Sequence, residues 1–254
     1  MSNSKMLEMH PDKTVFVTFG TKNQIKSLDD LSKKEPIYFN DFVTKKKVSE
    51  KWLGDMLHEG GLSLSVEETV KARYGMTVAA IYEVAAIVQD FRMQSIGGLQ
   101  TAIDLWELSI IPSLLNNSET WMEIADKAIQ LLEELQNMFV RAILRVPIST
   151  PKPALKWETG LAPMEHRIMI RKLTFLNDLK HHDDSVLAKQ LLKEQIRLGL
   201  PGLAKECSDI CLRLKLENIT KNVVPVKEWK RKVKLASKMQ SEVEIKNDME
   251  RLSK

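Results

Sequence analysis

Three long runs of apolar residues at helical spacing lie between residues 66 and 146, and they restrict this chain to a mainly helical fold. The first run covers about 66–92, the second 99–111 and the third about 119–146. In the first run the apolar face consists of Val66, Val70, Val78, Ile81, Ala85 and Val88. Three such helices joined by short connections predict a helical bundle.

Glycine and proline mark the expected ends of these helices. Gly97-Gly98 should interrupt the first helix, Pro112 should stop the second, and the third should end before Pro147. At the other end of the first helix, Ser65 is followed three residues later by Glu68, which fits a capping box.

The second half of the chain begins with a proline-rich segment at 146–163, which cannot be helical throughout and is the best internal boundary. Three shorter amphipathic helices are expected at about 163–180, 185–198 and 201–217. From 218 onward the sequence is rich in charge and poor in apolar residues, which predicts a solvated helix or a mobile tail.

The first 62 residues have β-type patterns instead. Residues 14–19 alternate β-branched and aromatic residues, and 36–43 and 51–57 are further strand candidates. The polar stretch "SLDDLSKKE" at 27–35 is expected to be a connection. The segment "SEKWLGDMLHEGGLS" at 49–63 predicts a short strand pair that turns at Leu53-Gly54.

Composition narrows the class of protein. The chain has 254 residues, of which 43% are hydrophobic and 28% charged, so it is globular. Its net charge of +4 permits nucleic-acid partners without requiring them. No stretch approaches the ~18 apolar residues of a membrane span, and Cys207 and Cys211 are expected to be buried thiols of a reducing compartment. A soluble, intracellular protein with no membrane partner is therefore predicted.

Few side chains suggest chemistry. The cluster "HHDD" at 181–184 lacks partners at metal-ligand spacing and is interpreted as a solvated loop, and no phosphate-binding glycine loop is present. No catalytic or metal-binding residue is therefore assigned. Lys71 and Arg73, near the start of the first long helix, are either ordinary solvated cations or phosphate contacts along a groove.

Several segments, in order, resemble the reverse transcriptases of non-LTR retrotransposons. These are "HPDKTVFVTFG", "KWLGDMLHEGG" and "SVEETVKARYG", followed downstream by "SLLNNSETW", "LQNMFVRAILRVPISTPKPALKWETGLAP" and "IRKLTFLNDL". The resemblance covers roughly residues 5–215. It implies the end of a polymerase palm, a hairpin that grips the primer terminus, a helical thumb and the segment after it.

The same resemblance implies roles for individual residues. Trp52, Leu53 and Gly54 would lie in the primer-grip hairpin, where a backbone without Cβ can turn tightly and approach another backbone. Trp52 would either pack the hairpin onto the first thumb helix or stack on nucleic acid. Lys13 corresponds to a palm-edge lysine near the incoming triphosphate, although it would also suit the start of an edge strand.

The departure from that family concerns catalysis. Its polymerases hold two Mg²⁺ ions on paired aspartates that precede the segment around Lys13, and this chain has only about ten residues there. "SLDDLS" at 27–32 comes after Lys13 and lacks the aromatic residue of such a box, so it is rejected. Mg²⁺ is implied for the full-length enzyme. For this chain alone no cofactor is expected, and whether it belongs to an enzyme stays open because the chain by itself should not polymerise.

These observations divide the chain into 1–62 (end of palm with hairpin), 63–147 (thumb-like bundle), 148–217 (post-thumb helices) and 218–254 (charged tail). The expected function is that of a fragment of an RNA-directed DNA polymerase, which binds an RNA–DNA or DNA duplex of primer and template. The missing N-terminal portion of the polymerase is a further expected partner. The alternative is a helical protein-interaction module of retrotransposon origin with no nucleic-acid role.

Overall fold

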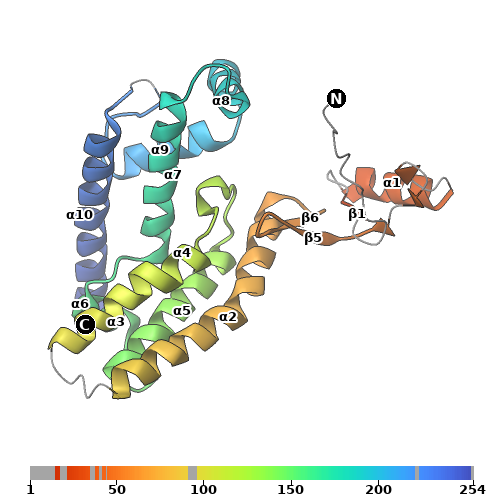
Figure 1. The fold of residues 1–254 in the computed structure, drawn as a ribbon. Coiled ribbons are helices and arrows are strands. Elements are labelled where there is room, and N and C mark those ends of the chain that lie inside the picture. The colour runs from red at the N-terminus through yellow and green to blue at the C-terminus, as the bar shows by residue number, and fades with distance from the viewer. Residues whose placement is uncertain are drawn as a thin grey trace, which may run out of the picture.

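A computed structural model describes residues 15–17, 22–34, 38–39, 42–43, 45–90, 96–220 and 223–252. The fold is mainly helical with a small β element, as the sequence predicts (Figure 1). The helices are α1 (Lys22–Lys34), α2 (Leu62–Asp90), α3 (Ile96–Leu105), α4 (Ile111–Leu114), α5 (Asp126–Leu144), α6 (Lys152–Thr159), α7 (Met164–His181), α8 (Leu187–Leu198), α9 (Leu203–Arg213) and α10 (Val226–Leu252). A π-turn, η2 (Trp106–Ile110), and a 3₁₀ turn, η3 (Ser118–Thr120), flank α4.

The strands form three two-stranded sheets among the described residues. They are β1 (Val15–Phe16), β2 (Tyr38–Phe39), β3 (Phe42–Val43), β4 (Lys45–Lys46), β5 (Ser49–Trp52) and β6 (Asp55–His58). β1 pairs in parallel with β4, whereas β2–β3 and β5–β6 are antiparallel. Within the segment 36–43, expected as one strand, the described residues form two strands, β2 and β3, that pair with each other. Of the strand expected at 14–19, residues 15–17 are described, and Val15–Phe16 form β1.

The polar stretch expected to be a connection is part of helix α1, so that prediction is wrong. Between Lys22 and Lys34 there is no glycine or proline, and Ile25, Leu28 and Leu31 recur at a spacing of three. This is a weak helical pattern, which the abundance of lysine and aspartate hides in the sequence.

The first hydrophobic core lies between α2 and α5 and is closed by α3, η2, α4 and α6 (Figure 1). Trp106 and Phe139 stack at its centre with their ring centroids 4.5 Å apart. Of the apolar positions predicted for the first long helix, Val66, Val70, Ile81, Ala85 and Val88 are buried and Val78 is half-buried. Leu132, Leu135 and Phe139 of α5 are buried opposite them. The N-terminal part of α7 belongs to this core as well, through Met164 and Ile168.

A second core surrounds the later part of α7 and is completed by α8, α9 and α10. Leu173 and Leu176 of α7 pack here with Trp229 and Val233 of α10. Cys207 and Cys211 are buried in the same core as unbridged thiols, as expected. The two cores meet within α7, whereas the boundary predicted from the sequence is the proline-rich segment 146–163, which contains α6.

Three of the expected helix ends are wrong. Gly97-Gly98 lie inside α3, and Pro112 lies inside α4. Proline is tolerated there because η2 shifts the backbone pairing just before it, so that the Ile111 N–H donates to the Trp106 carbonyl five residues back. The third long helix begins at Asp126 and not near Glu119, since left-handed backbone at Asn117 and Glu123 keeps the preceding segment irregular.

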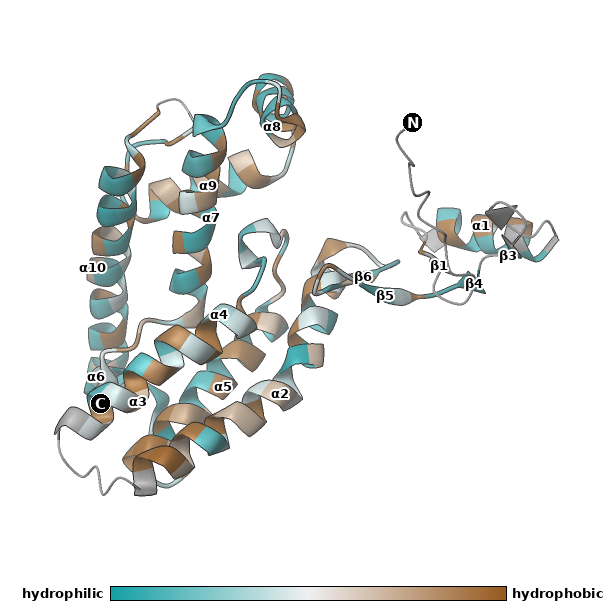
Figure 2. Cartoon of the chain, in the orientation of Figure 1, coloured by the Kyte–Doolittle hydropathy of each residue, from teal (hydrophilic) through white to brown (hydrophobic). Residues whose placement is uncertain are grey.

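The region after residue 218 is not merely a solvated helix or a mobile tail. Helix α10 lies along α7, and its buried residues recur every four positions: Trp229, Val233, Ser237, Ser241 and Ile245. Hydrophobic patches are visible along this mostly hydrophilic helix (Figure 2). Among the described helices, none is long and apolar enough to cross a membrane.

Candidate nucleic-acid interface

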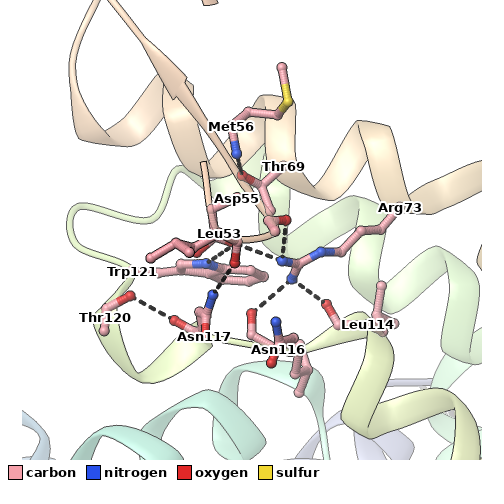
Figure 3. Close-up of polar contacts among 12 residues, drawn as sticks. Leu53, Asp55, Met56, Thr69, Arg73, Leu114, Asn116, Asn117, Thr120 and Trp121 are labelled. Atoms are coloured by element: carbon pink, nitrogen blue, oxygen red, sulfur yellow. Dashed lines mark hydrogen bonds and ion pairs between the residues drawn. The ribbon is translucent and has the colours of Figure 1, made fainter. Parts of the chain in front are cut away.

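The β5–β6 hairpin lies along the first turns of α2, and its two-residue turn reaches Arg73 of α2 and the segment after α4 (Figures 1 and 3). Trp52 pairs with Asp55 across the turn, which leaves Leu53 and Gly54 as its central residues. Their φ angles are 47° and 96°. Positive φ at both positions is the requirement of a type I′ turn, whose twist matches that of the flanking strands. The predicted strand pair is therefore present, with its turn at the expected residues.

The turn exposes two large apolar side chains. Trp52 is 64% exposed and Leu53 is 79% exposed. Of the two roles expected for Trp52, packing onto the first thumb helix does not fit this exposure. Leucine is also an unfavourable residue for left-handed backbone, which costs a non-glycine residue roughly 1–2 kcal/mol. An exposed leucine at this position is thus not explained by the folding of the hairpin.

Two hydroxyl groups of α2 hold the base of the hairpin. The backbone N–H of His58 donates to Ser65 Oγ at 2.9 Å, and that of Met56 donates to Thr69 Oγ1 at 2.7 Å. Each hydroxyl in turn donates to the carbonyl four residues before it in the chain. The capping box predicted at Ser65 is therefore wrong, because Ser65 is the fourth residue of α2 and its hydroxyl binds the strand.

Arg73 holds the turn itself (Figure 3). Its Nη2 donates to the Gly54 carbonyl at 2.8 Å and to Asp55 Oδ1 at 2.6 Å, and its Nη1 donates to the carbonyls of Leu114 and Asn116 at 3.0 and 2.9 Å. The guanidinium also lies 5.6 Å from the ring centroid of Trp121, within cation–π range.

Further contacts join the turn to the segment after α4. Asn117 Nδ2 donates to the Leu53 carbonyl at 3.0 Å, and Trp121 Nε1 lies 3.4 Å from Asp55 Oδ1. These hydrogen bonds of the turn use the Leu53 carbonyl and Asp55, and the side chains of Trp52 and Leu53 stay exposed. The hairpin is a rigidly mounted support for an exposed apolar tip.

Lys71 and Arg73 do not form a joint phosphate site in this arrangement. Arg73 is 8% exposed, and burial lowers the pKa of its guanidinium while Asp55 opposes that change. Lys71 is exposed and pairs with Glu67 and Glu68 on its own helix, and hydrogen bonding to these carboxylates raises its pKa. Arg73 thus joins the hairpin to the bundle, and only Lys71 is accessible to an external anion.

The outward face of α2 is apolar and made largely of small residues. Its exposed residues between positions 72 and 87 are Ala72, Gly75, Met76, Ala79, Tyr82, Glu83, Ala86 and Ile87. A Cβ atom added at Gly75 would meet nothing within 4 Å. This face leaves room for the close approach of another molecule, and it begins beside the hairpin.

The remaining titratable clusters have structural partners. Asp184 of the "HHDD" loop pairs with Lys189 and Lys193, which lowers its pKa to about 2. Asp29 of "SLDDLS" pairs with Lys46. No group of three or more potential metal ligands occurs within the described part of the chain. Lys13, the expected nucleotide-proximal residue, lies outside that part.

His166, Ser237 and Glu244 form an arrangement that resembles a catalytic triad. Nδ1 of His166 lies 3.1 Å from Ser237 Oγ and its Nε2 lies 2.9 Å from Glu244 Oε2. Ser237 is 1% exposed and sits in the middle of α10, where backbone N–H groups are used within the helix. Without donors for an oxyanion this cluster fits the docking of α10 on α7 and not acyl transfer.

Comparison with known proteins found no family model, curated protein or solved structure that matches this chain. The site must therefore be interpreted from its own geometry. Sequence reasoning located the turn but missed Asp55, Asn116 and Asn117 as its partners. The Asn116-Asn117 pair is a turn signal in the sequence, but no local pattern indicates that it meets a hairpin more than sixty residues away.

Proposed function

We propose that this chain is a reverse-transcriptase-derived fragment that binds a primer–template duplex through the tip of the β5–β6 hairpin. The observation that carries the proposal is the exposed Trp52-Leu53 pair on a turn fixed to the bundle by Arg73. The sequence resemblance described above assigns these same residues to a primer-grip hairpin.

Rigid mounting favours binding because little conformational freedom remains to be lost when a partner is bound. Stacking of a base or sugar face on an exposed aromatic side chain contributes roughly 1–3 kcal/mol per base. An indole at the tip next to an aliphatic side chain suits the end of a duplex, where one base pair has no stacked neighbour. The unfavourable leucine at the turn fits a position retained for contact and not for stability.

Phosphate contacts would come from lysines of β4, β5 and the residues between these strands. Lys45, Lys47 and Lys51 are exposed along the segment that leads to the turn. Three phosphate contacts would give a slope of about −3 in log K against log salt concentration on duplex DNA. Arg73 is not part of this footprint, because its guanidinium is fully engaged inside the molecule.

The test is fluorescence anisotropy with a labelled RNA–DNA hybrid that has a recessed 3′ end. Trp52→Ala should weaken binding about tenfold, as expected for the loss of one stacked base. Trp157→Ala is the matched control, since Trp157 is similarly exposed at 59% but lies on α6. Equal affinity of the wild type and the Trp52→Ala variant, or binding that ignores salt, would contradict the proposal.

A second candidate function is supported by the apolar outward face of α2. Met76, Tyr82 and Ile87 are 66%, 61% and 45% exposed, and three large apolar side chains exposed along one helix are unusual in a protein without a partner. In this alternative the chain is a protein-interaction module and α2 packs against another polypeptide, including the portion of a polymerase that precedes the palm end. Failure of every hybrid and duplex to bind, together with retained protein association, would favour it.

A further inference from the structure

A groove of about 860 Å³ lies on the opposite part of the molecule, between α6, α7, the end of α3 and the middle of α10. Apolar side chains line much of it, among them Ile103, Trp157, Ile170, Met239 and Val243. Trp157, Met239 and Val243 are each more than half exposed. The groove is therefore an apolar surface with an aromatic side chain at one wall.

Helix α10 carries two apolar faces, and only one of them is packed. The buried face, from Trp229 to Ile245, contacts α7 and α6. A second series, Leu235, Met239 and Val243, recurs every four residues and is 59%, 60% and 54% exposed. Side chains four residues apart lie on the same side of a helix, so this series is a continuous stripe at the edge of the groove.

The charge around this stripe is positive. Five cations line the groove, Lys156, Arg167, Lys234, Lys238 and Lys246, against two carboxylates, Glu107 and Glu242. Arg167 neutralises Glu107 through two hydrogen bonds of 2.6 and 2.7 Å, and Lys156 pairs with Glu133 behind the groove. Among the described residues, Lys234 and Lys246 form no ion pair. The groove therefore has uncompensated positive charge at both ends of the apolar stripe, before Leu235 and after Val243.

We propose that the α6–α10 groove binds an acidic amphipathic helix of a partner protein. Aliphatic side chains of that helix would lie on Met239, Val243 and Trp157, and its carboxylates would pair with Lys234 and Lys246. Recognition of an amphipathic helix by an apolar groove uses anchors at spacings of three, four and seven residues. The stripe from Leu235 to Val243 matches about two turns of such a helix. This proposal is independent of the function proposed for the hairpin.

Two other occupants fit the groove less well. A second copy of α10 would bring its own lysines against Lys234 and Lys246, and like charges in contact disfavour association. A nucleic acid would meet Glu242 and a mainly aliphatic stripe, which offers only Trp157 for base stacking. The combination of aliphatic surface and lysine flanks is complementary to a helix that has aliphatic and acidic faces.

The test starts from an unbiased phage library of 16-residue helical peptides selected on the full chain. Enriched peptides should carry several Asp or Glu residues beside aliphatic residues at i, i+4 and i+7. A fluorescein-labelled enriched peptide is then titrated with three variants of the chain. Lys234→Glu/Lys246→Glu and, separately, Met239→Lys/Val243→Lys should each weaken binding at least tenfold. Lys227→Glu/Lys205→Glu, which makes the same charge change at exposed lysines outside the groove, should leave it unchanged.

Circular dichroism melting of each variant checks folding, and all substituted side chains are exposed, so melting temperatures should stay close to the wild type. Enriched peptides that are neutral or basic, or whose binding resists both groove variants, would overturn the proposal. A selection without enrichment would also count against it. A concentration-dependent dimer in sedimentation velocity that Met239→Lys/Val243→Lys abolishes would assign the groove to a second copy. Binding of a dT20 oligonucleotide that Lys234→Glu/Lys246→Glu abolishes would assign it to nucleic acid.

Discussion

Arg73 shows how one side chain can change the interpretation of a site. In the sequence it is a basic residue near the start of a long helix, next to Lys71, and both were expected to be candidates for phosphate contact. In the fold its guanidinium is buried under the hairpin turn and satisfies three carbonyl oxygens and Asp55. Its charge stabilises the protein from within, so a loss of binding in an Arg73 variant would report a loss of structure.

Arg73→Ala should therefore reduce stability, because it leaves three carbonyl groups without this donor and a partly buried carboxylate with only the Trp121 indole N–H. The expected loss is about 3 kcal/mol in the free energy of unfolding. Arg73→Lys should recover only part of it, since an ammonium group cannot reproduce the planar fork. Urea denaturation measures both, with Lys71→Ala as a control that should leave the midpoint unchanged. A stable Arg73→Ala protein would refute the structural role.

Leu53 leads to a prediction in which stability and binding move in opposite directions. Leu53→Asn places a residue that tolerates left-handed backbone before Gly54, and Asn-Gly is the preferred type I′ pair. We expect unfolding to become harder by about 1 kcal/mol, the strain that leucine imposes there. Affinity for the RNA–DNA hybrid should fall at the same time. A variant that is more stable and binds as tightly as the wild type would separate Leu53 from the proposed contact.

At the scale of elements, α2 performs two tasks on two faces. Its inner side supplies Ser65, Thr69 and Arg73 to the hairpin and Val70 and Ile81 to the core, whereas its outer side presents small and apolar residues to the surroundings. Thr69 is 1% exposed, and Gly75 faces open space on the other side. These two residues allow the two faces to be tested one at a time.

Thr69→Val should release the hairpin from α2, since it removes the acceptor for the Met56 N–H while keeping the volume of the side chain. Leaving that amide without a partner costs about 1–3 kcal/mol. Thr69→Ser restores the hydroxyl and should regain most of the loss. Hydrogen exchange at the Met56 amide gives a local readout, and slow exchange in the valine variant would contradict the assignment.

Gly75→Ala should raise the free energy of unfolding by about 0.5–1 kcal/mol, because glycine in a helix interior loses more conformational freedom on folding. Gly75→Glu keeps the helix but adds a long anionic side chain to the outer face. Weaker hybrid binding by the glutamate variant alone would place the duplex along α2. Unchanged hybrid binding by both would leave this face to a protein partner.

The elements themselves differ in how far the sequence predicts them. Long helices with one apolar face, such as α5 and α7, follow from periodicity, because burial alone decides their register. Helix α1 was missed since its few apolar residues stand among lysines and aspartates. Pro112 was misjudged because the π-turn that accommodates it leaves no signal in composition. The buried face of α10 that packs on α7 was not predicted, because a second, exposed apolar series and many lysines obscure its four-residue spacing.

The candidate site was only half predictable for a related reason. Leu53-Gly54 is a local turn signal and was found. The contacts that fix it come from Arg73, Asn116 and Asn117, which are distant in sequence, and no local pattern states whether an arginine will be buried or exposed. Burial at Arg73 depends on where α4 delivers its carbonyl oxygens, and that depends on the whole bundle.

At the scale of the whole molecule, α7 belongs to two hydrophobic cores in succession. Met164 and Ile168 pack with the α2–α5 bundle, whereas Leu173 and Leu176 pack with α9 and α10. A continuous helix shared by both cores should couple their unfolding.

The thiols of the second core provide the measurement. Burial raises the pKa of both Cys207 and Cys211, so they should react with a disulfide reagent only when that core opens. Core substitution Phe139→Ala in the first core, which should cost about 3–5 kcal/mol, is expected to accelerate their labelling if the cores unfold together. An unchanged rate of thiol labelling in the Phe139→Ala variant would show that the second core opens independently.

The contacts between α2 and the hairpin repeat every four residues along the helix and every two residues along the strand. Four residues of helix advance about 6.0 Å, whereas two residues of strand advance about 6.8 Å. The spacing of the contacts along the helix and along the strand therefore differs by about 0.8 Å at each step. The steps are Ser65 with His58, Thr69 with Met56, and Arg73 with Gly54. Short hydroxyl side chains make the first two contacts, where the offset between helix and strand is small. At the third contact the offset has grown to about 1.6 Å, and there a longer side chain, the arginine, makes the hydrogen bond.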